Sequence, residues 1–270
     1  MRKFWIFTLL SIVTLSASAD EIVMRAVKSN KEYHSIEVGG PIKVFVEERT
    51  DGNIIVRATE KIHSILELKI EDYTLTISFP KGFDIKKKSD FVQAEVYIPN
   101  NGKLEEFTVL ACGIIDVKPQ IRAKEVDIEC VAASQIDIDV VADKLSIDVV
   151  GAAKAAVKAE CTSIEVELTG ASTLSLSGKA TKGEFDVVGA SSLYAESFHC
   201  SQLEAECTGA SSAEISADMA EVDAAGASTA NVACTTRLDA SAAGASTIRY
   251  SGDCQVNIKE ASGASAIKKK

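Results

Sequence analysis

The sequence has little of what most enzyme sites and nucleic-acid interfaces are built from. Aromatic residues make up 6% of the chain, there are three histidines, and the only tryptophan is Trp5. No Cys-x-x-Cys pair is present, so the spacing typical of a structural zinc site is absent. Acidic residues outnumber basic ones by 39 to 29. Because nucleic acids and anionic membrane surfaces attract basic proteins, this charge excludes both as partners.

Long apolar runs are also absent, except at the N-terminus. Arg2 and Lys3 precede an apolar stretch over residues 4–15, and Ser16-Ala17-Ser18-Ala19 follows as a small-x-small cleavage pattern. The stretch is shorter than the about 20 residues that a membrane-spanning helix needs. No cysteine follows it to serve as a lipid-attachment site. We therefore predict a signal peptide over residues 1–19, and a mature chain from Asp20 that has no transmembrane segment. We expect this chain to be exported to the periplasm, the outer surface or the extracellular space.

Cysteine is present, but in an odd number. The seven cysteines cannot all pair within one chain, and we expect most of them to be buried thiols that pack as small apolar residues. Cys234 and Cys254 fall in neighbouring repeats, where stacked strands lie about 4.8 Å apart. That spacing is within the disulfide range, so the sequence leaves open whether these two residues form a disulfide.

A Gly-Ala-Ser repeat dominates the second half of the chain. It recurs with a period of about 19 residues, which is typical of solenoid repeats. The interval is longest just before Gly209 and shortest just after it. Counting back by the same period leads to Ala132 and then to Gly113, which makes nine copies from residue 111 onwards. Apolar and polar residues alternate on both sides of each glycine, and a period of two indicates strands with one buried face. The glycines are Gly151, Gly170, Gly189, Gly209, Gly226, Gly244 and Gly263.

This repeat predicts an all-β fold, a single-stranded parallel β-helix of about 19-residue coils, right-handed as parallel crossovers nearly always are. Glycine permits the unusual backbone angles of the corner, and the serines are expected to form a column with hydrogen bonds between coils. We assign residues 111–270 to the repeats. Residues 20–110 are a less regular β region that caps or continues the helix, with a solvated loop at Lys86–Lys88.

Acidic residues occupy the outward positions three and five residues before the glycines. Three interpretations are open: a solvated face that keeps the rod soluble, a calcium site, because hard cations favour carboxylate oxygens, or a docking face for a basic partner. No catalytic set accompanies them. The histidines are scattered, and the serine of the Gly-Ala-Ser repeat is not a catalytic nucleophile, because an enzyme does not need nine copies of one. The candidate cation- or partner-binding residues are Asp127, Glu129, Glu165, Glu167, Glu184, Asp186, Glu204, Glu206, Glu221 and Asp223.

The strand pattern of the N-terminal third, the segment Val96-Tyr97-Ile98-Pro99 and the Gly-Ala-Ser ladder together resemble the head-GIN-domain auto-transporter adhesins of Bacteroidetes-type bacteria. The resemblance covers residues 25–267 and implies a structural repeat and an adhesin function, but it brings no functional residues. We expect an exported, non-catalytic cell-envelope or surface protein, an adhesin that binds a protein or glycan along the flank of the helix.

Two alternatives to an adhesin remain. One is a polysaccharide-active enzyme on a β-helix scaffold. It is weakened by the scarcity of aromatics in the repeats, which are Phe185, Tyr194, Phe198 and Tyr250. The other is a structural envelope element, a homo-oligomer that assembles end to end through the coil edges near Lys268–Lys270. Neither alternative requires a cofactor.

Overall fold

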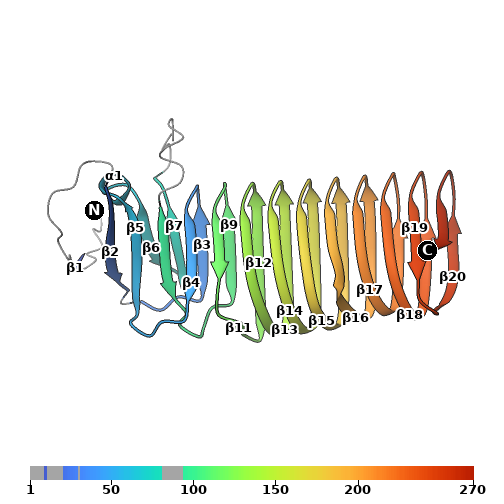
Figure 1. The fold of residues 1–270 in the computed structure, drawn as a ribbon, viewed down its shortest axis with the longest axis horizontal. Helices are drawn as coiled ribbons and strands as arrows, with labels where there is room; N and C mark the ends of the chain where they lie inside the picture. The colour runs from blue at the N-terminus through green and yellow to red at the C-terminus, as the bar shows by residue number, and fades with distance from the viewer. Residues whose placement is uncertain (1–8, 11–20, 30, 81–93) are drawn as a thin grey trace.

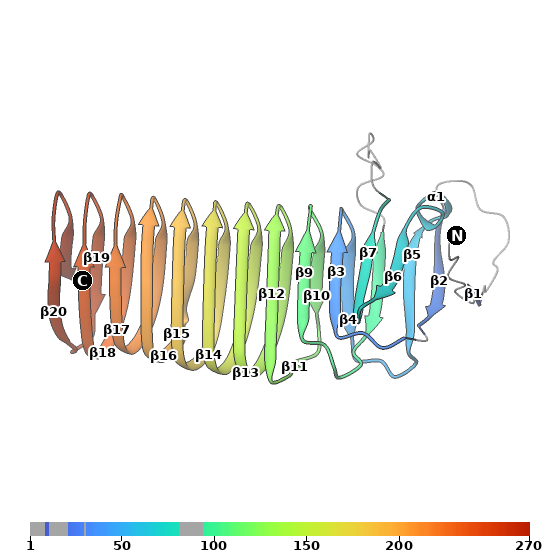
Figure 2. The ribbon, with the colours of Figure 1, turned by 180° about the vertical axis from the view of Figure 1, so that it is seen from behind.

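The structure is a computed structural model that describes residues 9–10, 21–29, 31–80 and 94–270. Most of the predicted signal peptide, its cleavage site and the Lys86–Lys88 loop lie outside these residues. Figure 1 shows a straight rod of stacked β-coils, and Figure 2 shows the same stack from behind. The N-terminal strands form one end of the rod and the last strands form the other. Among the described helices, none has the length and hydropathy needed to cross a lipid bilayer.

Long parallel strands form the regular part of the rod, and each continues around a corner from one side of a coil to the next. They pair in register, so that Ile147 lies beside Val166 and Val166 beside Phe185. The result is a nearly all-β parallel solenoid of about nine turns with about 19-residue spacing, which confirms the predicted fold class. The strands are β12 (Glu125–Ala132), β13 (Gln135–Gly151), β14 (Lys154–Gly170), β15 (Thr173–Gly189), β16 (Ser192–Gly209), β17 (Ser212–Ala224), β18 (Thr229–Ala242), β19 (Thr247–Ser251), β20 (Gln255–Ala261) and β21 (Ala266–Lys269).

The interior of the rod is filled by columns of apolar side chains, one residue from each coil. Val166, Val187 and Val222 are each at most 1% exposed, as the alternating pattern predicts. Because successive side chains of a strand point to opposite faces, burying these positions places the residues between them on the outside. The alternation in the sequence therefore decides both the core and the outer surface.

Glycine is required at the corner for two reasons. Gly189 and Gly209 have φ angles of +84° and +90°, a region that costs an L-residue with a side chain about 1–2 kcal/mol. In addition, a Cβ atom added to Gly209 would lie 2.8 Å from the carbonyl oxygen of Gly189. The coils approach this closely because the ladder of hydrogen bonds continues through the turn. The N–H of Ala190, for example, donates to the Gly170 carbonyl at 2.7 Å.

The serines form a column as predicted, and most of them are buried, but their hydrogen bonds are mostly not between serines. Ser172 donates to Ser191 across coils at 3.2 Å, whereas Ser191 donates to the Val188 carbonyl of its own coil at 2.7 Å. Ser246 donates to the Ala224 carbonyl of the preceding coil at 2.9 Å. The coil spacing of about 4.8 Å exceeds a hydrogen-bond length, so a nearby carbonyl is the closer acceptor.

The predicted position of Gly113 at a corner is wrong. Ile114 pairs with Gln135, so Ala111 takes the place that Ala132 has in the next coil. Gly113 instead occupies the serine position, where its carbonyl accepts from the Gln135 N–H at 2.9 Å. Ile114 and its partner Gln135 are 21 residues apart in the sequence, whereas Ile121 and its partner Val140 are 19 residues apart. The difference arises between Val117 and Ile121, beside a proline that interrupts the strand.

The N-terminal region contributes two coils, and their order in space differs from their order in the chain. The coil of β3 and β4 lies between the coil of β7 and β8 and that of β9 and β10, with parallel pairing on both sides. Figure 1 shows these strands in line with the repeats. Their bounds are β3 (Ser35–Gly39), β4 (Lys43–Glu47), β7 (Thr74–Ser78), β8 (Glu95–Pro99), β9 (Glu106–Leu110), β10 (Ile114–Val117) and, bridging to the repeats, β11 (Ile121–Arg122).

Antiparallel strands then cover the outer end of this stack. β5 (Asn53–Thr59) pairs with β8, β6 (Glu67–Glu71) pairs with β7, and β2 (Ile22–Lys28) pairs with β5, all in the antiparallel sense. The short helix α1 (Glu60–His63) follows β5, and β1 (Leu9–Leu10) pairs with β2. Strands β5 and β6 pair with the last parallel coil and so cover its sheet edge, which would otherwise be exposed.

We predict that Gly209→Ala lowers the melting temperature more than Gly52→Ala does. Both glycines have positive φ, +90° and +66°, so both variants suffer backbone strain. Only at Gly209 would the new methyl group collide with the preceding coil, because nothing lies within 4 Å of a Cβ atom at Gly52. Thermal unfolding followed by circular dichroism measures the difference. Equal losses would contradict the close approach of coils at the corner.

We also predict that thiol reagents distinguish the cysteines of the folded protein. All seven are free thiols, Cys112 is exposed, and Cys200 and Cys207 are buried. Burial raises the pKa of Cys200 and of Cys207 to about 12, which removes the reactive thiolate at neutral pH. Maleimide labelling with peptide mapping should find Cys112 first, and alkylation after denaturation should find seven thiols. A shortfall at Cys234 and Cys254 would instead show a disulfide.

Candidate functional site

The structure brings the ten predicted acidic residues together on one outer face of the rod. They form two columns along the rod, in which Glu165 lies beside Glu184 and Glu167 beside Asp186. In the coil before Glu165 and Glu167 the two columns continue through Ser146 and Asp148. All ten are exposed except Asp186, which is half-buried. We call this surface the acidic face. Its first column contains Asp127, Glu165, Glu184, Glu204 and Glu221, and its second contains Glu129, Glu167, Asp186, Glu206 and Asp223.

Desolvation and like charges disfavour ionisation at two positions on this side of the rod. Partial burial raises the pKa of Asp148, and the neighbouring carboxylates of Glu167 and Glu129 raise it further. Burial followed by repulsion from Glu106 has the same effect on the pKa of Asp127. The folded state therefore favours the protonated form of these groups. Their repulsion is absent at low pH and weakens the fold as the pH rises through the raised pKa.

On the opposite sheet of the rod, the pKa of a carboxyl group is lowered instead of raised. Partial burial opposes ionisation of Asp139, but hydrogen bonds from Lys158 at 2.8 Å and Gln120 at 3.0 Å outweigh it and lower the pKa of Asp139. Lys158 comes from the next coil, so this ion pair joins adjacent turns. Here ionisation stabilises the fold, and the contribution is lost as the pH falls.

Within the described part of the chain, no three side chains of histidine, cysteine, aspartate or glutamate converge so as to hold a metal ion. The acidic columns spread their carboxylates along the rod at the coil spacing of about 4.8 Å, whereas calcium is bound by six to eight oxygens at about 2.3–2.6 Å. Calcium binding to the acidic face stays a prediction.

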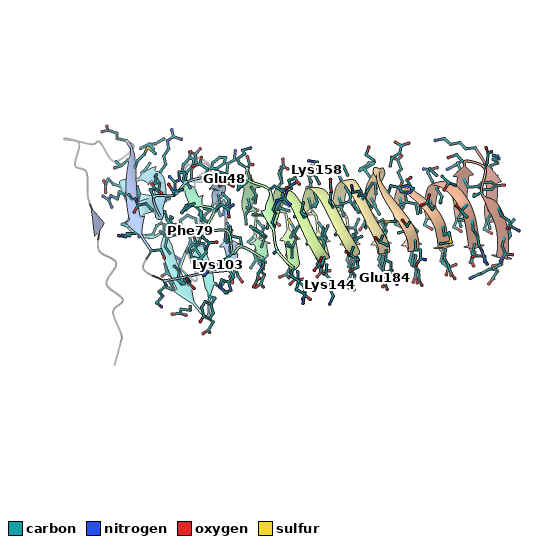
Figure 3. The ribbon with its side chains drawn as sticks, turned by 90° about the horizontal axis from the view of Figure 1, so that it is seen from below. Glu48, Phe79, Lys103, Lys144, Lys158 and Glu184 are labelled. Carbon is teal, nitrogen blue, oxygen red and sulfur yellow. The ribbon has the colours of Figure 1, made fainter. Side chains whose placement is uncertain are left out.

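A groove runs along one edge of the acidic face, and sequence reasoning missed it. It has a volume of about 840 Å³, crosses seven coils from β12 to β18, and has a floor of buried residues such as Leu145 and Leu203. One wall is the first acidic column. The other, seven residues before the corner, is mixed in charge and includes Lys144, Lys182 and Arg237. Figure 3 shows Lys144 and Glu184 along the same edge of the rod.

Two ion pairs partly neutralise the groove, the first along one wall and the second between the two walls. Lys144 lies 3.3 Å from Glu125, and the Arg237 guanidinium lies 2.8 Å from Asp239. Acidic side chains still outnumber basic ones among the lining residues. The recurring basic residues seven before the corner were the signal in the sequence, but only the fold places them opposite the acids.

His199 has partners that the sequence did not reveal. Its Nδ1 atom lies 3.1 Å from the Ser216 hydroxyl and its Nε2 atom 3.3 Å from Asp218, while Thr235 donates to Asp218 at 2.7 Å. Hydrogen bonds from Thr235 and His199 lower the pKa of Asp218. The residues come from adjacent coils on the outer face, and none of them lines the groove.

A second cavity lies near this cluster, on the sheet opposite the acidic face. It is a shallow hollow of about 390 Å³ lined by residues of β13 to β17, among them Lys158, Tyr194 and Glu214. Of the four aromatics in the repeats, Phe185 and Phe198 are buried in the core, whereas Tyr194 is 49% exposed. The hollow differs from the groove because it is local to one place on the rod.

We predict opposite effects for two isosteric substitutions. Asp148→Asn removes a repelling charge and should raise the melting temperature at pH 7.5. Asp139→Asn removes an ion pair and should lower it. As the pH falls, the Asp148 difference should shrink first, because the pKa of Asp148 is raised. The Asp139 difference should persist until the pH falls below the ordinary aspartate pKa of about 3.9, because the pKa of Asp139 is lowered. Thermal unfolding between about pH 2.5 and 8 checks this. A change of the same sign in both variants would contradict the assignment.

Comparison with known proteins agrees with the architecture. The family described as "putative auto-transporter adhesin, head GIN domain" matches residues 32–219. No curated protein matches the chain. A solved structure from Parabacteroides distasonis, described as a putative adhesin, is 21% identical with a TM-score of 0.73, covering 92% of this chain and 97% of its own.

Two further solved structures share the fold. A putative adhesin from Parabacteroides merdae is 18% identical with a TM-score of 0.70, covering 93% of this chain and 96% of its own. A P. distasonis protein described as a putative lipid binding protein is 18% identical with a TM-score of 0.72, covering 92% and 96%. The match over most of the length of the rod shows that the chain belongs to the head-GIN-domain family of adhesin-like proteins.

Proposed function

We propose that the protein is an exported, non-catalytic surface protein that binds an elongated partner along its flank. The adhesin description of the family and of its solved relatives supports a surface role. The observation that carries the proposal is the groove, which continues across seven coils. At about 4.8 Å per coil it offers a contact about 30 Å long.

The groove suits an extended ligand better than a small one. Its floor repeats the same buried aliphatic environment in successive coils, so a linear chain meets equivalent contacts at each step. The excess of carboxylates along its walls favours a partner with basic groups, since complementary charge steers association. Many weak contacts of this kind add up only when the partner engages several coils together.

A non-catalytic role follows from the same regularity. Glycosidases that cleave polysaccharides use one pair of carboxyl groups at a defined separation, one of them tuned to be protonated. The carboxylates of the acidic face instead repeat in columns through the repeats, and no single pair among the ten predicted residues is set apart from the others. The enzyme alternative is therefore weaker than the binding role.

We predict that protease added to intact cells removes the protein, and that reversing the charge of the groove reduces adhesion. Glu184→Lys combined with Glu204→Lys should weaken attachment of the purified protein to wells coated with polylysine, an extended basic chain, because it replaces attraction with repulsion. The control is Glu48→Lys with Glu71→Lys, which makes the same change in net charge at the other end of the rod. Protection from protease until the outer membrane is permeabilised, or equal binding by both variants, would contradict the proposal.

A further inference from the structure

The repeat is irregular at β16, on both of its sides. The interval between corner glycines lengthens from Gly189 to Gly209 and then shortens from Gly209 to Gly226. The register with β15 shifts between Ser175 and Ser177, and the register with β17 shifts between Tyr194 and His199. Irregularities of this kind re-aim side chains and are frequent beside functional sites. Register shifts also occur between β17 and β18 and between β18 and β20, but β16 is shifted against both of its neighbours. A local site can arise there.

The break adjoins the hollow of about 390 Å³. One column of outward residues runs through it, in the order Asp137, Ala156, Ser175, Tyr194, with each residue paired to the next. The two middle side chains are short and the two end ones are long, so a depression forms between them. Its ends are three coils apart, or about 14 Å between Cα atoms. That length suits one or two sugar units.

Tyr194 provides an aromatic face at one end of this hollow. Its side chain is 49% exposed, although an aromatic ring ordinarily packs against other apolar groups. Within the described residues, the side chain of Tyr194 makes no hydrogen bond and no ring stacking contact. An exposed aromatic ring beside a depression marks a contact surface, because the ring offers a rigid apolar face at a small loss of side-chain entropy.

Polar groups surround the ring on the remaining sides. The carboxylates of Asp137, Glu196 and Glu214 line the hollow together with hydroxyl groups, among them that of Ser197. Lys158 is already engaged by Asp139 at 2.8 Å. Carboxylates accept strong hydrogen bonds from hydroxyl groups and repel anions. Acidic sugars and phosphates are therefore disfavoured, and neutral hydroxyl-rich ligands fit.

We propose that this hollow is a carbohydrate-binding site for a neutral hexose unit of a glycan, with Tyr194 stacking on the sugar face and the carboxylates binding its hydroxyl groups. The proposal rests on the adhesin-like function proposed above and names a ligand class for it. It places glycan recognition on the sheet opposite the acidic face, away from the groove.

The test is a printed array of neutral, sialylated and sulfated glycans, followed by titration of the strongest neutral binder. Wild-type protein should bind neutral glycans, and Tyr194→Ala should weaken binding at least about tenfold, as expected for the loss of an aromatic contact. Tyr194→Phe keeps the ring and should remain within about threefold of wild type. Tyr73→Ala removes another exposed tyrosine, outside the hollow, and should have no effect. Because Tyr194 is on the surface, all three variants should fold, which circular dichroism verifies.

Several results would overturn the proposal. They are the absence of binding to any neutral glycan, equal binding by Tyr194→Ala and Tyr73→Ala, or binding of an oligolysine peptide alone. Glycan binding that is lost with Glu184→Lys and Glu204→Lys but kept in Tyr194→Ala would place recognition in the groove, leaving the surface role intact. Conversely, glycan binding through Tyr194 by a protein that stays protease-protected in intact cells would contradict the surface role alone.

Discussion

The structure depends on stacking each coil in register on the one before, including at the corner. Hydrogen bonds of 2.7 Å from the alanine N–H to the glycine carbonyl of the previous coil carry the ladder through the turn. A side chain at the glycine position would block this contact. Once the backbone is held at one spacing, equivalent residues lie directly beside each other. The aliphatic columns inside and the charged columns outside both follow from this register.

The same register decides how charge behaves on each side. On the acidic face it places carboxylates beside carboxylates, and burial together with repulsion raises the pKa of Asp148. On the opposite sheet it places Lys158 beside Asp139, and the pKa of Asp139 falls. Identical stacking therefore destabilises one face and stabilises the other, depending only on which residues recur.

A regular stack produces continuous surfaces, and a local site needs an irregularity. The groove is continuous because seven coils contribute equivalent residues to it. The hollow at Tyr194 is shorter, because it forms where two short side chains lie between two long ones, next to the register shifts of β16. The rod thus carries two kinds of surface, one suited to extended partners and the other to a small unit.

The sequence alone determined the nearly all-β coil, its buried columns and its acidic columns, because alternation and spacing are local properties that stacking simply repeats. It also contained the uneven spacing around Gly209, but not its consequence. Only the tertiary structure decided that β3 and β4 insert between later strands, that Ala111 replaces Gly113 at the corner, and that His199 meets Ser216 and Asp218. Each of these depends on which coil lies beside which. That arrangement is set by register between distant segments, and no residue pattern within one coil specifies it.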